Sequence, residues 1–202
     1  MAEQSLIVSM WEEILENYDE QDRAAFVGGG EEAVERLEAK LGFALPQEFA
    51  DYVQFYCPSE NLGVAELYQG TSLISYGSLG EQEYHEGYGL NYLEADDEAF
   101  WLLIAEDNEF AIITDLKNES CPIFYYSGED SEILDQLAPN LAHGLSLLGY
   151  WQRLQGESEA EGDSPEWLDV IKTFQEKLNV LAPGVTARAW QFDRNPYTTF
   201  DD

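Results

Sequence analysis

The fold class follows from a central stretch of the chain, residues 101–114, which reads WLLIAEDNEFAIIT. Its two largely apolar runs, 101–105 and 110–114, are rich in β-branched and aromatic residues, and such residues favour β-strands. The polar residues 107–109 between the runs are few enough to reverse the chain direction. The stretch therefore predicts an antiparallel β-hairpin.

Segments 73–76 and 122–126 are likewise rich in β-branched and aromatic residues, so we expect the middle of the chain to form a meandering sheet. On both sides of this block, apolar residues recur every three or four positions, which is typical of amphipathic helices. The predicted helices cover residues 5–18, 31–41, 45–56, 139–154 and 165–181. This order predicts an α+β fold in which N-terminal helices pack on a mainly antiparallel sheet and C-terminal helices follow.

Glycine and proline mark the ends of the N-terminal helices. Gly42 is expected to end the second helix, and Pro46 to be the first residue of the third, where a missing N–H costs little. The three glycines at 28–30 indicate a hinge rather than a phosphate-binding loop. No GK[ST] follows them, and the next residues, Glu31 and Glu32, would repel a phosphate.

The chain is expected to contain one main α+β domain, residues 1–155, followed by an acidic linker or loop at 156–164. Residues 165–202 then form a C-terminal helix and a tail. This tail is rich in aromatic residues, namely Trp190, Phe192, Tyr197 and Phe200. A tail of this composition is expected to pack on the domain, because large apolar rings favour burial.

The charge balance excludes several classes of partner. The chain has 41 Asp and Glu against 9 Lys and Arg, a net charge of −32, while 45% of its residues are hydrophobic and favour a folded domain. Such a charge repels nucleic-acid phosphates and anionic lipids, so no nucleic acid and no membrane is expected as a partner. The N-terminus lacks the basic segment of a signal peptide, and a cytoplasmic location is therefore expected.

The acidic residues are concentrated in one part of the sequence. Residues 41–116 contain fifteen Asp or Glu and neither Lys nor Arg. This pattern has two interpretations that the sequence leaves open. The acids either form a solvated surface, as in proteins adapted to high salt, or they form a surface complementary to a strongly basic partner.

No catalytic motif accompanies the two histidines, His85 and His143. No G-x-S-x-G elbow surrounds any serine, so a Ser/His/Asp triad has no support. His85 lies near Glu81, Glu83 and Glu86, a group that could hold a divalent cation in a hydrolase, although HExxH is absent. We therefore expect neither catalytic nor metal-binding residues, and no cofactor, and keep a metal-dependent hydrolase as an alternative.

The two cysteines, Cys57 and Cys121, lie far apart in the sequence and form no CxxC pair. This spacing favours neither a zinc site nor a disulfide framework. Both are expected to be buried structural thiols.

Several short motifs resemble the SUKH superfamily, which includes the cell-wall-assembly regulator of yeast and many bacterial immunity proteins. Residues 34–42, VERLEAKLG, and 45–53, LPQEFADYV, are similar to the opening "E..LG..LP.dy..f" of that family. Residues 104–116 look like its "ia.d..g..y..dl" hairpin, and 138–154 like its closing helix. The chain departs from the family at 57–61, where Asn-Gly is common, and at Glu109, where the hairpin has glycine.

The resemblance implies an α+β fold without catalytic apparatus and a protein-binding role, most often the neutralisation of a bacterial toxin. A basic, nuclease-like toxin domain would fit the acidic surface, which would occlude its active site. A regulatory scaffold of the same family is the alternative. The residues expected to contact the partner are Glu60, Glu66, Glu81, Glu83, Tyr84, Glu86, Tyr88, Asp96, Asp97 and Glu98.

Overall fold

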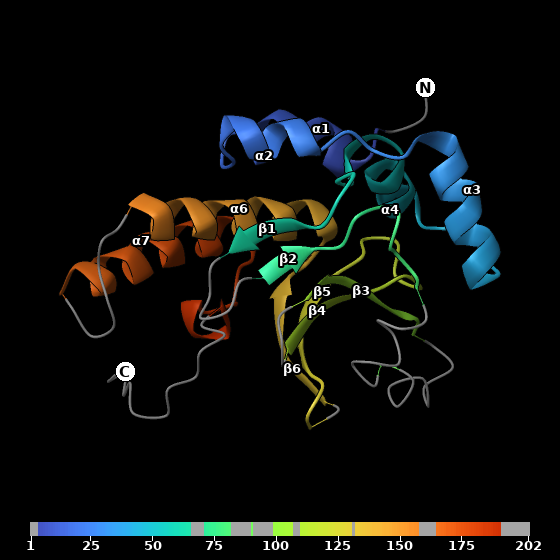
Figure 1. Cartoon of the computed structure of the whole chain (residues 1–202). Coiled ribbons are helices and arrows are strands. Elements are labelled where there is room, and N and C mark those ends of the chain that lie inside the picture. Colours follow the sequence, from blue (N-terminus) through green and yellow to red (C-terminus); the bar gives the residue numbers. More distant parts are fainter. Residues whose placement is uncertain are drawn as a thin grey trace.

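Along the chain, helices precede and follow an antiparallel sheet built from its middle, so the predicted α+β class is confirmed (Figure 1). The computed structural model describes residues 4–65, 71–81, 90, 99–106, 110–130, 132–157 and 165–190. Buried side chains from the helices and from the sheet form one hydrophobic core.

The described strands form a six-stranded sheet in which each strand pairs with its neighbours along the chain. The strands are β1 (Leu62–Ala65), β2 (Thr71–Leu73), β3 (Trp101–Glu106), β4 (Phe110–Asp115), β5 (Ile123–Ser127) and β6 (Glu132–Ala138). All five pairings are antiparallel. The expected hairpin is confirmed, because Leu103 pairs with Ile113 and Trp101 with Asp115. Its turn, 107–109, lies outside the described residues.

The sheet differs from the expectation at its edges. The edge strands β1 and β6 were not predicted, because β1 is short and contains Gly63 and β6 mixes acidic and apolar residues. The predicted strand 73–76 is wrong beyond residue 73, because β2 ends at Leu73. The N–H of Ser75 bonds to the side chain of Asn61, and that of Tyr76 bonds to the carbonyl of Pro58, so the chain leaves the ladder there.

The N-terminal helices are α1 (Leu6–Leu15), α2 (Glu20–Ala25), α3 (Gly30–Leu41) and α4 (Gln47–Asp51), followed by a π-helical turn, η1 (Tyr52–Tyr56). Helix α3 ends as expected, with Gly42 in the left-handed conformation at φ 80°. The third predicted helix is divided between α4 and η1. Pro46 is not its first helical residue: its ψ of 143° places it just before the helix.

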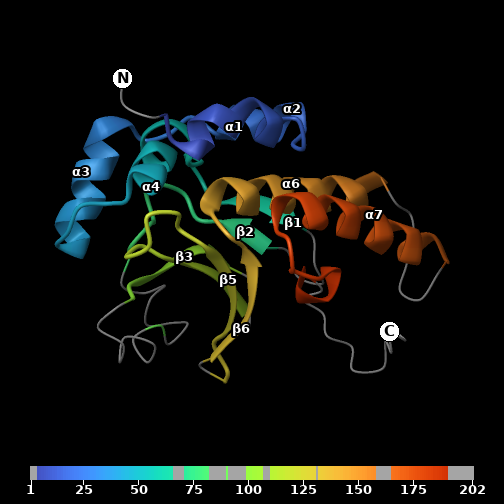
Figure 2. The same ribbon diagram turned by 180° about the vertical axis from the view of Figure 1, so that it is seen from behind.

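The C-terminal helices lie side by side: α6 (Leu141–Glu157) and α7 (Pro165–Leu181), followed by a short 3-10 helix, η3 (Ala187–Trp190) (Figure 2). Helix α6 also packs against α1. Trp190 is buried against Phe174, and its indole Nε1 donates to the carbonyl of Leu137 in β6 at 3.2 Å. Leu168, expected on the buried face of α7, is largely exposed. The aromatic tail beyond Trp190 lies outside the described residues.

Candidate functional site

The structure describes two of the ten residues expected to contact a partner, Glu60 and Glu81. The others lie outside the described residues: Glu66, Glu83, Tyr84, Glu86, Tyr88, Asp96, Asp97 and Glu98. His85, the centre of the alternative metal site, also lies outside them. In the part of the chain that is described, no three His, Cys, Asp or Glu side chains come close enough to hold a metal ion.

Glu60 is exposed on a segment that joins the N-terminal helices to the sheet. Its neighbour Ser59 donates its N–H to the carbonyl of Ala25 at 3.1 Å, and Pro58 pairs with Phe26 as an isolated bridge. These contacts hold Glu60 beside the end of α2. Its side chain makes no hydrogen bond or ion pair with another described residue.

Glu81 is already engaged within the molecule. Its carboxylate contacts the ammonium of Lys40 at 2.5 Å, and this hydrogen bond and charge lower the pKa of Glu81. Lys40 is near the end of α3, whereas Glu60 lies beside the segment that leads into α3. Because ten residues of α-helix rise about 15 Å, the structure does not bring Glu60 and Glu81 together.

Glu48, one of the acids in the stretch 41–116, holds the fold together instead of facing solvent. Glu48 is only 7% exposed, and its Oε2 accepts the N–H of Ile7 at 3.2 Å. Burial raises the pKa of Glu48, while the N–H groups of Ile7, Leu6 and Ala142 oppose that rise. Since those N–H groups belong to the first turns of α1 and α6, one carboxylate serves the N-terminal ends of two helices.

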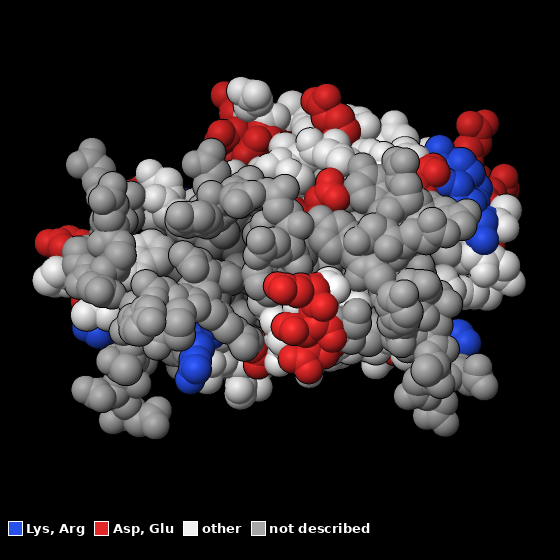
Figure 3. Space-filling view, turned by 60° about the horizontal axis from the view of Figure 1, so that its bottom comes forward, with Lys and Arg blue, Asp and Glu red and all other residues white. Residues whose placement is uncertain are grey.

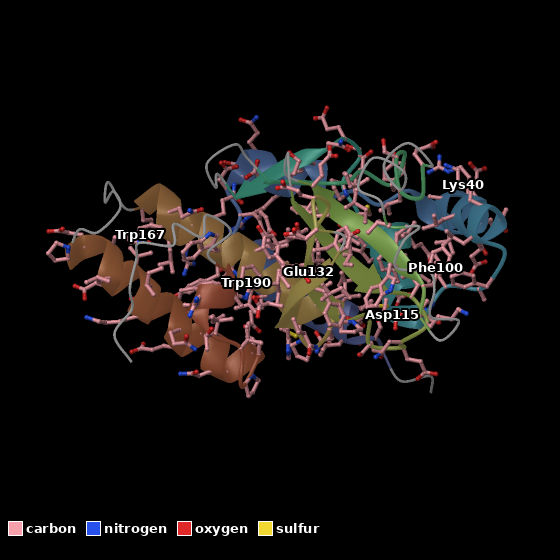
Figure 4. The ribbon with its side chains drawn as sticks, turned by 90° about the horizontal axis from the view of Figure 1, so that it is seen from below. Lys40, Phe100, Asp115, Glu132, Trp167 and Trp190 are labelled. Atoms are coloured by element: carbon pink, nitrogen blue, oxygen red, sulfur yellow. The ribbon has the colours of Figure 1, made fainter. Side chains whose placement is uncertain are left out.

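Asp51 and Asp115 are also used internally. Asp51 accepts the hydroxyl of Ser5 at 2.5 Å and the amide of Gln47 at 2.8 Å. Asp115 accepts the N–H of Phe100 at 2.9 Å, and Figure 4 shows these two residues side by side. These acids are therefore not available to a partner.

A further group of exposed acids, which was not singled out in the sequence, lies at the turn between β5 and β6. Its members are Glu129, Asp130 and Glu132. The carboxylates of Glu129 and Glu132 have no ion-pair partner among the described residues. Figure 3 shows one group of acidic side chains in the middle of this face; other acidic side chains and the basic ones lie toward its rim. Figure 4 shows Glu132 well apart from Lys40.

An exposed apolar pair lies at the other end of the molecule, near α1, α2 and α4. Val27 is 57% exposed and Phe55 is 48% exposed. The chain at Gly28 is pressed against the backbone of Gln54 and Phe55, and Phe26 bridges to Pro58, so the two backbone segments that carry these exposed side chains lie against each other. Phe55 was not singled out in the sequence, because only the apolar face of the predicted helix was considered there. The signal that could have found Phe55 is its position off that face, where a large apolar side chain is exposed.

Gly28 and Gly29, two of the three glycines after Val27, form a packed contact, which corrects the interpretation of the glycines as a hinge. The N–H of Gly28 bonds to the carbonyl of Cys57 at 3.0 Å, and that of Gly29 to the carbonyl of Val53 at 2.9 Å. Gly28 has φ 63°, and a Cβ there would overlap the carbonyl of Gln54. Only glycine fits this approach of two backbones.

Burial shifts the pKa values of the described thiols and of the His143 imidazole. Cys57 and Cys121 are buried and unpaired with each other, as expected. Burial raises the pKa of the Cys57 thiol well above its usual range and raises that of Cys121 to about 12. Burial also lowers the pKa of the His143 imidazole. The backbone N–H of His143 donates to the side-chain oxygen of Asn140.

These features define the class of protein: it is an α+β domain with a strongly acidic surface. The model of the SMI1 / KNR4 family (SUKH-1) matches residues 28–146, more than half of the chain. The chain therefore belongs to the SMI1 / KNR4 family (SUKH-1). Comparison with curated proteins finds no matching relative. No helix in the described residues is both long and apolar enough to cross a membrane.

Proposed function

We propose that this chain is a non-catalytic protein-binding module that neutralises a basic, nuclease-like bacterial toxin by occluding its active site. The observation that carries the proposal is the net charge of −32 on a domain of the SMI1 / KNR4 family (SUKH-1). Part of this charge is free to act outward. The carboxylates of Glu60, Glu129 and Glu132 are exposed and make no ion pair with a described residue.

The physical reason lies in the partner's own chemistry. A nuclease holds phosphates in a basic cleft, and carboxylates can occupy the same cleft as competitors. Opposite charges also steer the two proteins together, although this attraction is screened beyond about 10 Å at 0.1 M salt. Inhibition by occlusion requires no reacting group in the inhibitor.

The test begins with the gene next to this one and, where that gene encodes a toxin domain, uses the purified domain. Co-expression of this chain in a bacterial host should restore growth in the presence of that domain. The affinity of the purified pair should fall about tenfold or more when salt rises from about 0.05 to about 0.3 M. A neighbouring toxin that is not inhibited, or an affinity that does not depend on salt, would overturn the proposal.

A charge-neutral variant makes the test specific. Replacement of Glu60, Glu129 and Glu132 together by Gln removes three negative charges, while each side chain keeps its length and one acceptor oxygen. The matched control replaces Glu157, Asp169 and Glu13 by their amides, which removes as many charges from acids that already pair with Arg153, Lys172 and Lys177. The first variant should bind the toxin more slowly than the control.

A further inference from the structure

We propose that Val27 and Phe55 form the apolar centre of the partner-binding surface, and that this centre receives one large apolar side chain from a cationic segment of the partner. The inference rests on the proposed function and deepens it, because it assigns the contact to one end of the molecule. Figure 1 shows α1, α2 and α4 at that end, away from the hairpin of β5 and β6.

The π-helical turn holds Phe55 in a fixed position. The N–H of Cys57 bonds to the carbonyl of Tyr52 at 2.7 Å, which closes the wide turn, and Tyr52 and Val53 are buried in the core. Phe55 therefore points outward from an anchored segment. A side chain presented by a rigid backbone loses little conformational entropy on binding.

The exposed pair is continuous with a buried aromatic cluster. Trp11 stacks on Tyr56 with ring centroids 4.2 Å apart and meets Phe26 edge to face at 5.3 Å. The ring centroids of Phe55 and Tyr56 are 5.8 Å apart. Val27 follows Phe26 directly in the chain. Helix α7 also has two exposed apolar side chains, Leu168 and Val180, but these are twelve positions apart and form no such pair. An apolar centre backed by packed rings is typical of binding hot spots.

Exposed acids lie on the segments next to this apolar centre. Glu60 lies beside the end of α2, and Glu31 is in the first turn of α3, four residues after Val27. Glu12 of α1 is close enough to Tyr56 to raise the pKa of its phenol, after burial and Asp51. The nearby cation, Arg23, has its Nε bonded to the carbonyl of Tyr18 at 2.8 Å.

Charge complementarity selects the occupant. A Lys- or Arg-rich segment with one central apolar residue would satisfy both the acidic rim and the apolar centre. A second copy of this chain would bring two acidic rims together, which opposes self-association. A neutral apolar segment would leave the acidic rim without a partner.

The probe is a synthetic hexapeptide, Lys-Arg-Trp-Lys-Arg-Lys, and the control peptide has Ala in place of Trp. Titration of the full chain, followed by amide NMR, should give shifts at residues 26–28 and 53–60. The Trp peptide should bind about tenfold more tightly than the Ala peptide. Phe55→Ser should remove that preference, and Val27→Ser should weaken it.

The matched control is Val180→Ser, which also removes an exposed apolar side chain and should leave the preference for Trp unchanged. The inference is overturned if the peptides do not bind, if they bind equally, or if the shifts centre on residues 129–132. It is also overturned if sedimentation shows a dimer that Phe55→Ser dissociates. Equal toxin inhibition by Phe55→Ser and by the wild type would overturn this inference alone, whereas the absence of toxin binding would overturn the proposed function.

Discussion

Acidic residues serve opposite purposes at the two ends of the molecule. Between α1 and α4, Glu48 and Asp51 are buried and accept hydrogen bonds from Ile7 and Ser5. At the turn between β5 and β6, Glu129 and Glu132 are exposed and have no partner among the described residues. A carboxylate in the first group stabilises the fold, whereas one in the second contributes to the field that a partner meets. Their sign is the same, and their surroundings decide their role.

The largest expected effect comes from removal of a buried acid. Glu48→Ala removes the acceptor for Ile7 and leaves N–H groups at two helix ends unpaired, so it should destabilise the fold by about 2–3 kcal/mol. Urea unfolding measures this change. Glu129→Ala is the control at the other end and should change stability by less than about 0.5 kcal/mol. Equal effects of the two substitutions would contradict the comparison.

A smaller effect is expected from Asp51→Asn, because an amide retains one acceptor oxygen. The variant keeps a hydrogen bond to Ser5 or to Gln47 but not the charge-assisted pair, and a loss of about 1 kcal/mol is expected. The same unfolding measurement tests it. Ser5→Ala should then cost less stability in the Asp51→Asn variant than in the wild type, because the two substitutions remove the same interaction.

The pH dependence distinguishes the buried acid in another way. The folded protein raises the pKa of Glu48, so the fold favours its protonated form. The contribution of this group is present in full below the pKa of the unfolded chain, about 4.3, and is lost as pH rises through the folded pKa. Glu48→Gln, which cannot ionise, should therefore gain stability relative to the wild type as pH rises from about 4 to about 7. A constant difference across that range would contradict the assignment.

The smallest effect is expected at the exposed pair of Lys40 and Glu81. Lys40→Ala removes the hydrogen bond and the charge that lower the pKa of Glu81, so this pKa should move back toward its usual range. NMR titration of the Glu81 carboxyl measures the shift. Thermal unfolding should hardly change, because exposed ion pairs contribute little to stability. A large fall in Tm would show that the pair fixes α3 to the chain at 76–81.

The strands of the central hairpin could be predicted because their signal is local. Residues 101–105 and 110–114 are apolar and β-branched or aromatic, and both runs are strands in the structure. Strand β6 gave no such signal, because Glu132 and Asp135 interrupt its apolar residues. It pairs with β5 all the same, since neighbouring backbone groups complete the ladder whatever the side chains are.

The candidate site was less predictable, because it depends on contacts between distant parts of the chain. The absence of Lys and Arg from residues 41–116 could be read directly, but the approach of Lys40 to Glu81 joins residues 41 positions apart. Phe55 was missed for a related reason. Its exposure beside Val27 results from the close packing of Gly28 on the π-helical turn, which no sequence period indicates.

By itself, the sequence determined the net charge, the α+β class and the positions of most helices, because charge and hydrophobic period are local properties of the chain. Only the tertiary structure decided which acids are buried, which are paired and which remain free. It also placed the chain at Gly28 against the backbone of Phe55. The reason is physical: the pKa and the exposure of a side chain depend on atoms brought near it by folding, and those atoms come from anywhere in the chain.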